Sequence, residues 1–301
     1  MTNHHDKQRS LSFGRTGLKV SAIGFGAGHI GDPDQIDERE ANKLLNEVLD
    51  AGVTLIDTAR GYGLSEERIG KYISARRDEY VLSTKVGYGI EGYEDWTYDC
   101  IIAGVDHALR LLKTDVLDIV HLHSCPLETL RQGEVIEALH KAVEAGKVRV
   151  AAYSGENEDL DFAIATGAFS SLQFSVNLFD QRSIDRQLSE ADRQQLGVIA
   201  KRPIANAPWR FEEHPVGLYC EAYWLRMKQM GIEPGDMSWN EMAIRFSAFQ
   251  TGVSSCILGT SNISHLREQL RYIDHGPLPE QVETEIREAF RRHDQNWIGQ
   301  I

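Results

Sequence analysis

The sequence lacks several features that would assign it to particular classes of protein. None of its 301 residues lies in an apolar run near the roughly 18 residues that span a bilayer, and no secretory signal is visible in the polar segment 1–10. Basic residues are few, 32 against 45 acidic ones, and the net charge of −13 disfavours nonspecific binding to nucleic acids. The four cysteines form no CxxC pair, which favours a reducing compartment. We therefore expect a cytoplasmic protein that binds neither membranes nor nucleic acids.

What the sequence does contain is an alternation of short apolar runs with longer amphipathic stretches. Hydrophobic residues make up 42% of the chain, which excludes a disordered protein. Residues 1–9 carry no pattern and are predicted to be a mobile tail. Eight runs rich in Val, Ile and Leu are predicted to be strands, at 20–27, 53–59, 80–86, 116–123, 148–154, 171–177, 197–203 and 253–259.

The stretches between these runs have the spacing of helices that bury one face. Apolar residues repeat with helical spacing over 41–49, 101–112 and 135–143. Asp37 and Glu40 have the spacing of a capping box before the first of these helices, and Ser238 and Glu241 have the same spacing near the end of the chain. Gly146 is expected to end the third helix.

Strands that alternate with helices predict parallel pairing, because a parallel connection needs a crossover. An open doubly wound sheet is one solution, but eight strands suit a closed (β/α)8 TIM barrel better. With no Pro- or Ser-rich linker, we expect one such domain over residues 10–301, with room for a short N-terminal β-hairpin. The long segments 87–97 and 204–237 would lie at its C-terminal mouth, where their aromatic residues either line a substrate pocket or pack the loops onto the barrel.

Polar residues end or follow several predicted strands, which is where barrel enzymes carry their catalytic groups. A buried Lys85 needs a partner for its charge, and Asp57 on the neighbouring strand is the candidate. A cation beside Tyr62 would stabilise its phenolate and make the phenol a usable proton donor. An imidazole at His123 could hold a carbonyl oxygen. These residues by themselves indicate chemistry at a carbonyl group.

A resemblance to a known family makes this interpretation specific. The segment 52-GVTLIDTARGYGLSEERIG-70 closely resembles the aldo-keto reductase signature D-T-A-x-x-Y-G-x-S-E-x-x-x-G. Further similar phrases stand in the family's order: 13-FGRTGLKVSAIGFGAG-28, 81-VLSTKVG-87, 115-DVLDIVHLHSCP-126 and 257-ILGTSNISHLREQL-270. Such phrases are weak evidence singly and strong evidence as an ordered set.

The resemblance implies a (β/α)8 barrel that uses NADPH or NADH to reduce an aldehyde or ketone reversibly to an alcohol. Tyr62 would be the general acid, tuned by Lys85 and Asp57, and His123 would orient the carbonyl of a small substrate. Hydride would come from nicotinamide C4, and no metal is required.

The resemblance also implies a set of residues that bind the cofactor. Ser154 and Gln173 would hold the carboxamide. The segment at the end of the eighth predicted strand would bind the cofactor, with phosphate at 259–262 where a helix opens, through Gly259, Thr260, Ser261, Asn262, His265 and Gln269.

Three departures from the family pattern concern the cofactor. Gly155 stands where several members have Asn after the carboxamide-binding serine. Lys201 and Arg202 stand where many members stack a tyrosine on the nicotinamide, so the stacking partner is either absent or an Arg guanidinium plane. Gly259 and His265 stand where many NADP-specific members have Lys and Arg. We expect NADP because members of the family commonly use it. Use of NAD, or of both nucleotides, stays open.

Two alternatives of other classes are weighed against this prediction. Some proteins similar to aldo-keto reductases serve as nucleotide-sensing partners of other proteins and show little turnover. His121 and His123 are two apart on one strand and point to the same side, so a barrel metallohydrolase is a remote alternative. The retained set of Asp57, Tyr62, Lys85 and His123 favours carbonyl chemistry over both.

Overall fold

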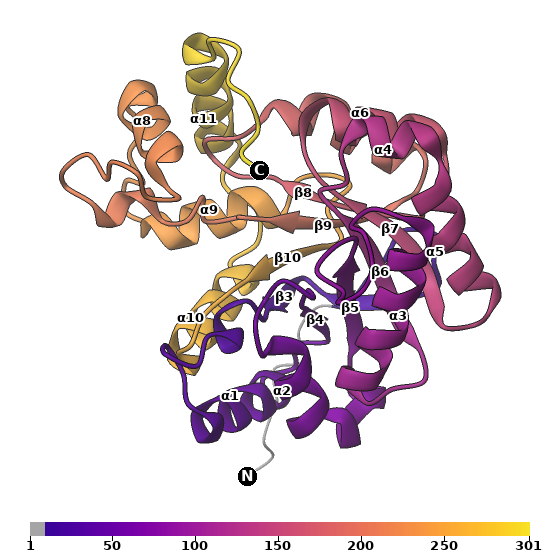
Figure 1. The fold of residues 1–301 in the computed structure, drawn as a ribbon. Helices are drawn as coiled ribbons and strands as arrows, with labels where there is room; N and C mark the ends of the chain where they lie inside the picture. The colour runs from indigo at the N-terminus through magenta and orange to yellow at the C-terminus, as the bar shows by residue number, and fades with distance from the viewer. Residues whose placement is uncertain (1–9) are drawn as a thin grey trace.

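The computed structural model describes residues 10–301, so the predicted tail at residues 1–9 lies outside the described residues. Eight parallel strands close into a barrel in the order β10-β3-β4-β5-β6-β7-β8-β9, and helices lie around it (Figure 1). This arrangement confirms the predicted (β/α)8 barrel and excludes the open sheet. The barrel strands are β3 (Ile23–Gly26), β4 (Leu55–Asp57), β5 (Val81–Val86), β6 (Leu117–His123), β7 (Val148–Ser154), β8 (Ser171–Ser175), β9 (Gly197–Lys201) and β10 (Ser255–Leu258).

The first predicted strand, 20–27, is divided into two strands with different partners. Its beginning forms β2 (Lys19–Ser21), which pairs antiparallel with β1 (Ser10–Ser12), and the rest forms β3. The predicted N-terminal hairpin is therefore present. Phe13 and Val20 of this hairpin join Leu55 and Ile119 in a small apolar cluster, and Phe13 is fully buried. This cluster fills the barrel from the end at which the strands begin.

The helices follow the predicted apolar faces. They are α1 (Glu38–Asp50), α2 (Ser65–Tyr72), α3 (Tyr98–Leu112), α4 (Leu127–Gln132), α5 (Glu134–Glu144), α6 (Asn157–Thr166), α7 (Ser189–Arg193), α8 (Glu221–Met230), α9 (Trp239–Ala248), α10 (Ile263–Asp274) and α11 (Glu280–His293). No helix among residues 10–301 has the length and apolar character needed to cross a membrane.

The two predicted capping boxes have different outcomes. At α1 both bonds are present: Asp37 accepts from the backbone N–H of Glu40, and the Glu40 side chain accepts from that of Asp37. At α9 only half of the box forms, because Ser238 accepts from Glu241 N while the Glu241 carboxylate binds Arg245 instead. The start of each helix is nevertheless where the sequence places it.

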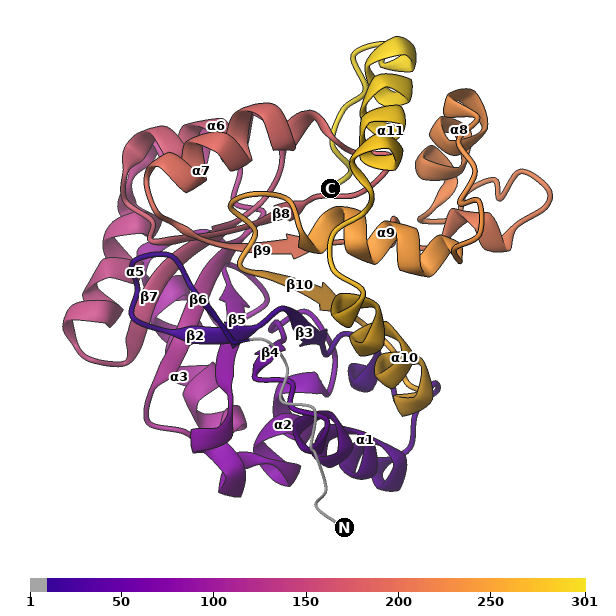
Figure 2. The same ribbon diagram turned by 180° about the vertical axis from the view of Figure 1, so that it is seen from behind.

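The long segment 204–237 contains a helix that the sequence analysis did not predict. Residues Tyr223, Met227 and Met230 of α8 are buried at helical spacing, and α8 and α11 lie together beside the barrel in both views (Figures 1 and 2). Trp209 of this segment stacks on Trp239, the first residue of α9, with ring centroids 5.4 Å apart. Aromatic residues of this loop therefore pack it against the rest of the protein.

Candidate active site

A buried ion pair lies at the centre of the barrel, where β4 and β5 are neighbours. Asp57 ends β4, and Lys85 lies in β5. Lys85 Nζ donates to Asp57 Oδ2 at 2.7 Å and to the Thr58 carbonyl oxygen at 2.7 Å, and the two charged side chains are each only 1% exposed. Asp57 Oδ1 accepts from Ser83 Oγ at 2.7 Å. The predicted partnership of Asp57 with Lys85 is therefore present in the structure.

The electrostatics of this pair keep both members charged. Burial favours the neutral form of each group. For Asp57 the nearby Lys85 ammonium outweighs burial, and the pKa of the carboxyl lies below its usual range. For Lys85 the negative charge of Asp57 likewise outweighs burial and raises the pKa of the ammonium. The site thus contains a fixed, water-excluded cation.

Tyr62 lies in the loop between β4 and α2, beside this cation. Lys85 Nζ is 5.0 Å from the centroid of the Tyr62 ring. The loop is fixed by a close backbone approach, since Leu64 N donates to the Gly31 carbonyl oxygen at 2.9 Å. A Cβ at Gly31 would lie 1.7 Å from the Tyr62 carbonyl oxygen, so only glycine fits there. The backbone contact with Gly31 therefore fixes the loop that carries Tyr62.

His123, the last residue of β6, lies between two tyrosines. Its ring meets the Tyr62 ring edge-on, with centroids 5.9 Å apart. On another side, the Tyr88 hydroxyl is 2.8 Å from Nδ1 of His123. Burial, reinforced by the charges of Lys85 and Lys201, lowers the pKa of His123 to about 3. The imidazole is therefore neutral at physiological pH and can donate a hydrogen bond without carrying charge.

Ser154 and Gln173 connect the predicted carboxamide site to the ion pair. Ser154 Oγ donates to Gln173 Oε1 at 3.1 Å, and Gln173 Nε2 donates to Asp57 Oδ1 at 3.0 Å. Both side chains are almost completely buried. The structure thus brings these two residues together with Asp57, on the inner side of the barrel.

Lys201 and Arg202 at the end of β9 are engaged with protein groups. Lys201 Nζ is 3.2 Å from Glu156 Oε1, and Arg202 binds Ser175 Oγ at 2.9 Å as well as the Gln300 carbonyl oxygen and the Tyr219 hydroxyl. Sequence reasoning missed Glu156, although an acidic residue two positions after a strand end was a readable signal. The Arg202 guanidinium is therefore tied to the C-terminal segment.

The remaining predicted cofactor residues lie where β10 leads into α10. Thr260 Oγ1 accepts from Asn262 N at 3.0 Å, and Asn262 caps α10 by accepting from Ser264 N at 2.9 Å. Gly259, Ser261 and His265 are exposed. Gln269 is buried, and its Oε1 has no hydrogen-bond partner among residues 10–301. A buried amide oxygen without a partner fits a donor group of a bound nucleotide.

His121 lies one layer deeper in the barrel than His123. It is fully buried, and its Nδ1 is 3.4 Å from both Ser83 Oγ and the Thr84 carbonyl oxygen. Across the described range 10–301, no group of three or more His, Cys, Asp or Glu side chains is arranged to hold a metal ion. The pair His121 and His123 therefore has no third ligand of this kind within that range.

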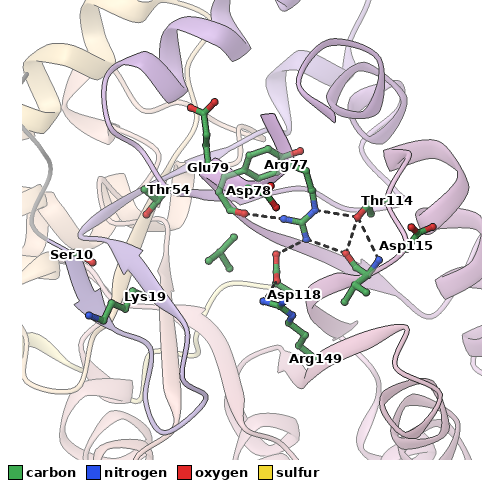
Figure 3. A pocket seen from close by; sticks show the side chains of 13 residues that line it. Ser10, Lys19, Thr54, Arg77, Asp78, Glu79, Thr114, Asp115, Asp118 and Arg149 are labelled. Atoms are coloured by element: carbon green, nitrogen blue, oxygen red, sulfur yellow. Dashed lines mark hydrogen bonds and ion pairs between the residues drawn. The ribbon is translucent and has the colours of Figure 1, made fainter. Parts of the chain in front are cut away.

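A separate cavity of about 540 Å³ opens at the other end of the barrel, near the starts of β5 and β6 (Figure 3). Arg77 crosses its wall and donates to Asp118 Oδ2 at 2.6 Å, and Arg149 lies 3.1 Å from Asp118 Oδ1. None of the predicted site residues lines this cavity. The candidate site residues lie instead toward the opposite, C-terminal ends of the strands, where barrel enzymes carry their catalytic groups.

Comparison with known proteins shows the family of this chain. The model of the Aldo/keto reductase family matches residues 22–291. This chain belongs to the aldo/keto reductase family. The aldo/keto reductase AKR11C1 of Bacillus halodurans, in its holo form, superposes with a TM-score of 0.81 at 25% identity, over 94% of this chain and 96% of that one.

Two curated relatives are similar to this chain over most of their length. YqkF of Bacillus subtilis, an uncharacterized oxidoreductase, is 28% identical over 87% of this chain and 90% of its own. L-Galactose dehydrogenase of Arabidopsis thaliana is 28% identical over 86% of each chain. This aldo/keto reductase is accordingly an oxidoreductase of the type that reduces carbonyl groups with a nicotinamide nucleotide.

Proposed function

We propose that this aldo/keto reductase reduces an aldehyde or ketone to an alcohol, in a reversible reaction, with Tyr62 as the proton donor. The observation that carries the proposal is the buried Lys85–Asp57 pair, 2.7 Å apart, beside the Tyr62 ring and across from a neutral His123. A phenol next to a fixed ammonium is the arrangement that proton donation to a carbonyl oxygen requires.

Each residue of the site has a separate task in this reaction. A nicotinamide nucleotide bound in the site would supply the hydride for the carbonyl carbon. Tyr62 gives its proton to the carbonyl oxygen, and the Lys85 ammonium compensates the negative charge that remains on the phenolic oxygen. Asp57 holds Lys85 in place through the bond at 2.7 Å. His123 donates a hydrogen bond from its neutral ring and orients the carbonyl.

The cofactor is proposed to be NADP, held along the mouth of the barrel. Ser154 and Gln173 would hold the carboxamide, and the unpartnered Oε1 of Gln269 would accept from the adenine amino group. Gly259, Thr260, Ser261 and Asn262 would bind phosphate at the start of α10. Lys201 and Arg202, which Glu156 holds, would lie beside the cofactor as fixed positive charges.

His265 is the residue at which the choice between NADP and NAD can be tested. It is exposed in the first turn of α10, and an imidazole binds phosphate with fewer hydrogen bonds than a guanidinium does. We expect His265→Arg to lower the Kd for NADP relative to NAD by roughly 10-fold, because a guanidinium adds a charged bond to the 2′-phosphate. Fluorescence titration with both nucleotides measures this ratio.

The control for His265→Arg is Gln132→Arg, which adds the same charge at the exposed end of α4. A ratio of the two Kd values that changes equally in both variants would show only a general effect of charge. An unchanged ratio in His265→Arg would remove His265 from the nucleotide site.

The test of the proposed function is a screen of NADPH and NADH against aldehydes and ketones, measured as kcat/KM. The panel should include sugars and sugar phosphates, since relatives include L-galactose dehydrogenase and L-glyceraldehyde 3-phosphate reductase. Turnover that depends on the carbonyl compound supports the proposal. Tight nucleotide binding with no turnover would instead favour a nucleotide-sensing role. This alternative is included because one relative, 26% identical over 89% of this chain, is a probable voltage-gated potassium channel subunit beta of Arabidopsis thaliana.

A further inference from the structure

Tyr88 contacts the active site, although neither the sequence motifs nor the proposed reaction gives it a task. It is the second residue after β5, and its hydroxyl is 2.8 Å from Nδ1 of His123. The Tyr88 and His123 rings lie nearly parallel, at 21°, with centroids 5.5 Å apart. Nε2 of His123 has no hydrogen-bond partner among residues 10–301.

The loop that carries Tyr88 is fixed at several points. Trp96 N donates to the Gly87 carbonyl oxygen at 2.7 Å, and the Trp96 ring lies against Gly87, where a Cβ would come within 2.2 Å of it. Gly87 also has φ +144°, which side chains rarely adopt. Gly89 N donates to Asp95 Oδ1 at 2.9 Å, and Trp96 meets the Tyr88 ring edge-on at 5.8 Å. The Tyr88 hydroxyl is therefore held in place by the whole segment 87–97.

The direction of the Tyr88–His123 hydrogen bond follows from the chemistry of its two partners. The neutral imidazole of His123 carries a single proton, on either Nδ1 or Nε2. Burial raises the pKa of Tyr88, so its hydroxyl keeps its proton at neutral pH. A phenol is a stronger acid than a neutral imidazole N–H, and imidazole nitrogen is a stronger base than phenolic oxygen. The bond is therefore favoured with O–H as donor and Nδ1 as acceptor.

We propose that Tyr88 is a positioning residue that donates to Nδ1 of His123 and so keeps the single ring proton on Nε2, the nitrogen left free to donate to the substrate carbonyl oxygen. In the opposite tautomer Nε2 would present a lone pair to that oxygen and repel it. This inference rests on the proposed carbonyl reduction, but the tautomer of His123 can be measured without any substrate.

Two-bond 1H–15N correlation spectra of histidine-labelled enzyme test the proposal, with the His123 signals assigned from His123→Gln. The native enzyme is expected to show His123 with its proton on Nε2, and Tyr88→Phe a mixture of both tautomers. The kcat/KM of Tyr88→Phe is expected to fall by about 2-fold, because loss of one neutral hydrogen bond shifts the tautomer equilibrium about 10-fold and takes the productive tautomer from roughly nine-tenths to roughly half of the molecules. Nucleotide Kd values should not change.

The matched control is Tyr93→Phe, in the same loop, where the side chain is 48% exposed and has no hydrogen bond among residues 10–301. If Tyr88→Phe does not fold, 3-fluorotyrosine can be placed at position 88. It keeps the ring and makes the hydroxyl a stronger hydrogen-bond donor to His123. The Nε2–H tautomer of His123 should then persist, with full activity. An unchanged tautomer in Tyr88→Phe, or a native enzyme with its proton on Nδ1, would overturn the proposal. A native enzyme with the expected tautomer but no carbonyl turnover would instead contradict the proposed function.

Discussion

Replacing Tyr62 by phenylalanine is expected to lower kcat by roughly 10³-fold while the Kd for the nucleotide stays nearly unchanged. The phenol is the group that gives its proton to the carbonyl oxygen, and its ring lies 5.0 Å from Lys85 Nζ and 5.9 Å from the His123 ring. The substitution removes one oxygen from a partly exposed side chain, so the fold should be retained. Steady-state kinetics and fluorescence titration of the nucleotide measure the two quantities.

Tyr93→Phe is the control for this substitution also, since it removes a hydroxyl at an exposed position. It should behave as the native enzyme in both measurements. Near-normal turnover of Tyr62→Phe would remove Tyr62 from the proton-donor role, and a parallel loss of nucleotide affinity would indicate a role in binding instead.

Replacing Lys85 by methionine is expected to remove both activity and a large part of the stability. Among residues 10–301, the substitution leaves the buried Asp57 carboxylate with only Ser83 Oγ and Gln173 Nε2 as side-chain donors. An uncompensated buried charge of this kind costs about 3–5 kcal/mol. Burial then favours the protonated carboxyl, so the folded-state pKa of Asp57 rises above the unfolded one and the loss of stability shrinks as pH falls. Chemical denaturation at pH 5 and pH 8 measures this difference.

The double variant Asp57→Asn, Lys85→Met separates stability from catalysis. Because the double variant removes both charges, most of the free energy of unfolding lost in Lys85→Met should return. Its kcat should nevertheless stay at least about 10²-fold below that of the native enzyme, because the Tyr62 phenolate has no counter-charge. Lys71→Met, which removes a half-exposed ammonium bound to Glu38, should be indistinguishable from the native enzyme. An active double variant would show that the ammonium has no part in proton transfer.

The sequence predicts the barrel well because its signals are local and repeated. Each of the eight predicted runs contains one barrel strand, and the Asp37 cap begins α1 as its spacing indicates. The run 20–27 is divided because its first residues pair with β1, outside the barrel, and no local pattern reveals which partner a strand will have. Helix α8 was missed since its buried face contains Tyr223, Met227 and Met230 within a polar segment.

The candidate site is predictable where residues stand at strand ends and less so where loops approach it. Asp57, Lys85 and His123 are placed by strand register, which brings Lys85 opposite His121 and Ser154 opposite His123. The contact of Tyr88 with His123 depends on the conformation of the 87–97 loop, and that of Glu156 with Lys201 depends on how β7 and β9 are placed around the barrel. Interactions between such distant segments have no signature in one sequence.

A crystal structure of the enzyme with NADP⁺ bound would test the central claim most directly. The account predicts that nicotinamide C4 lies at the C-terminal mouth of the barrel, close enough to the Tyr62 hydroxyl for one carbonyl group to reach both. It also predicts that Lys85 remains bonded to Asp57. A nicotinamide ring bound elsewhere, with Tyr62 and Lys85 far from C4, would contradict it.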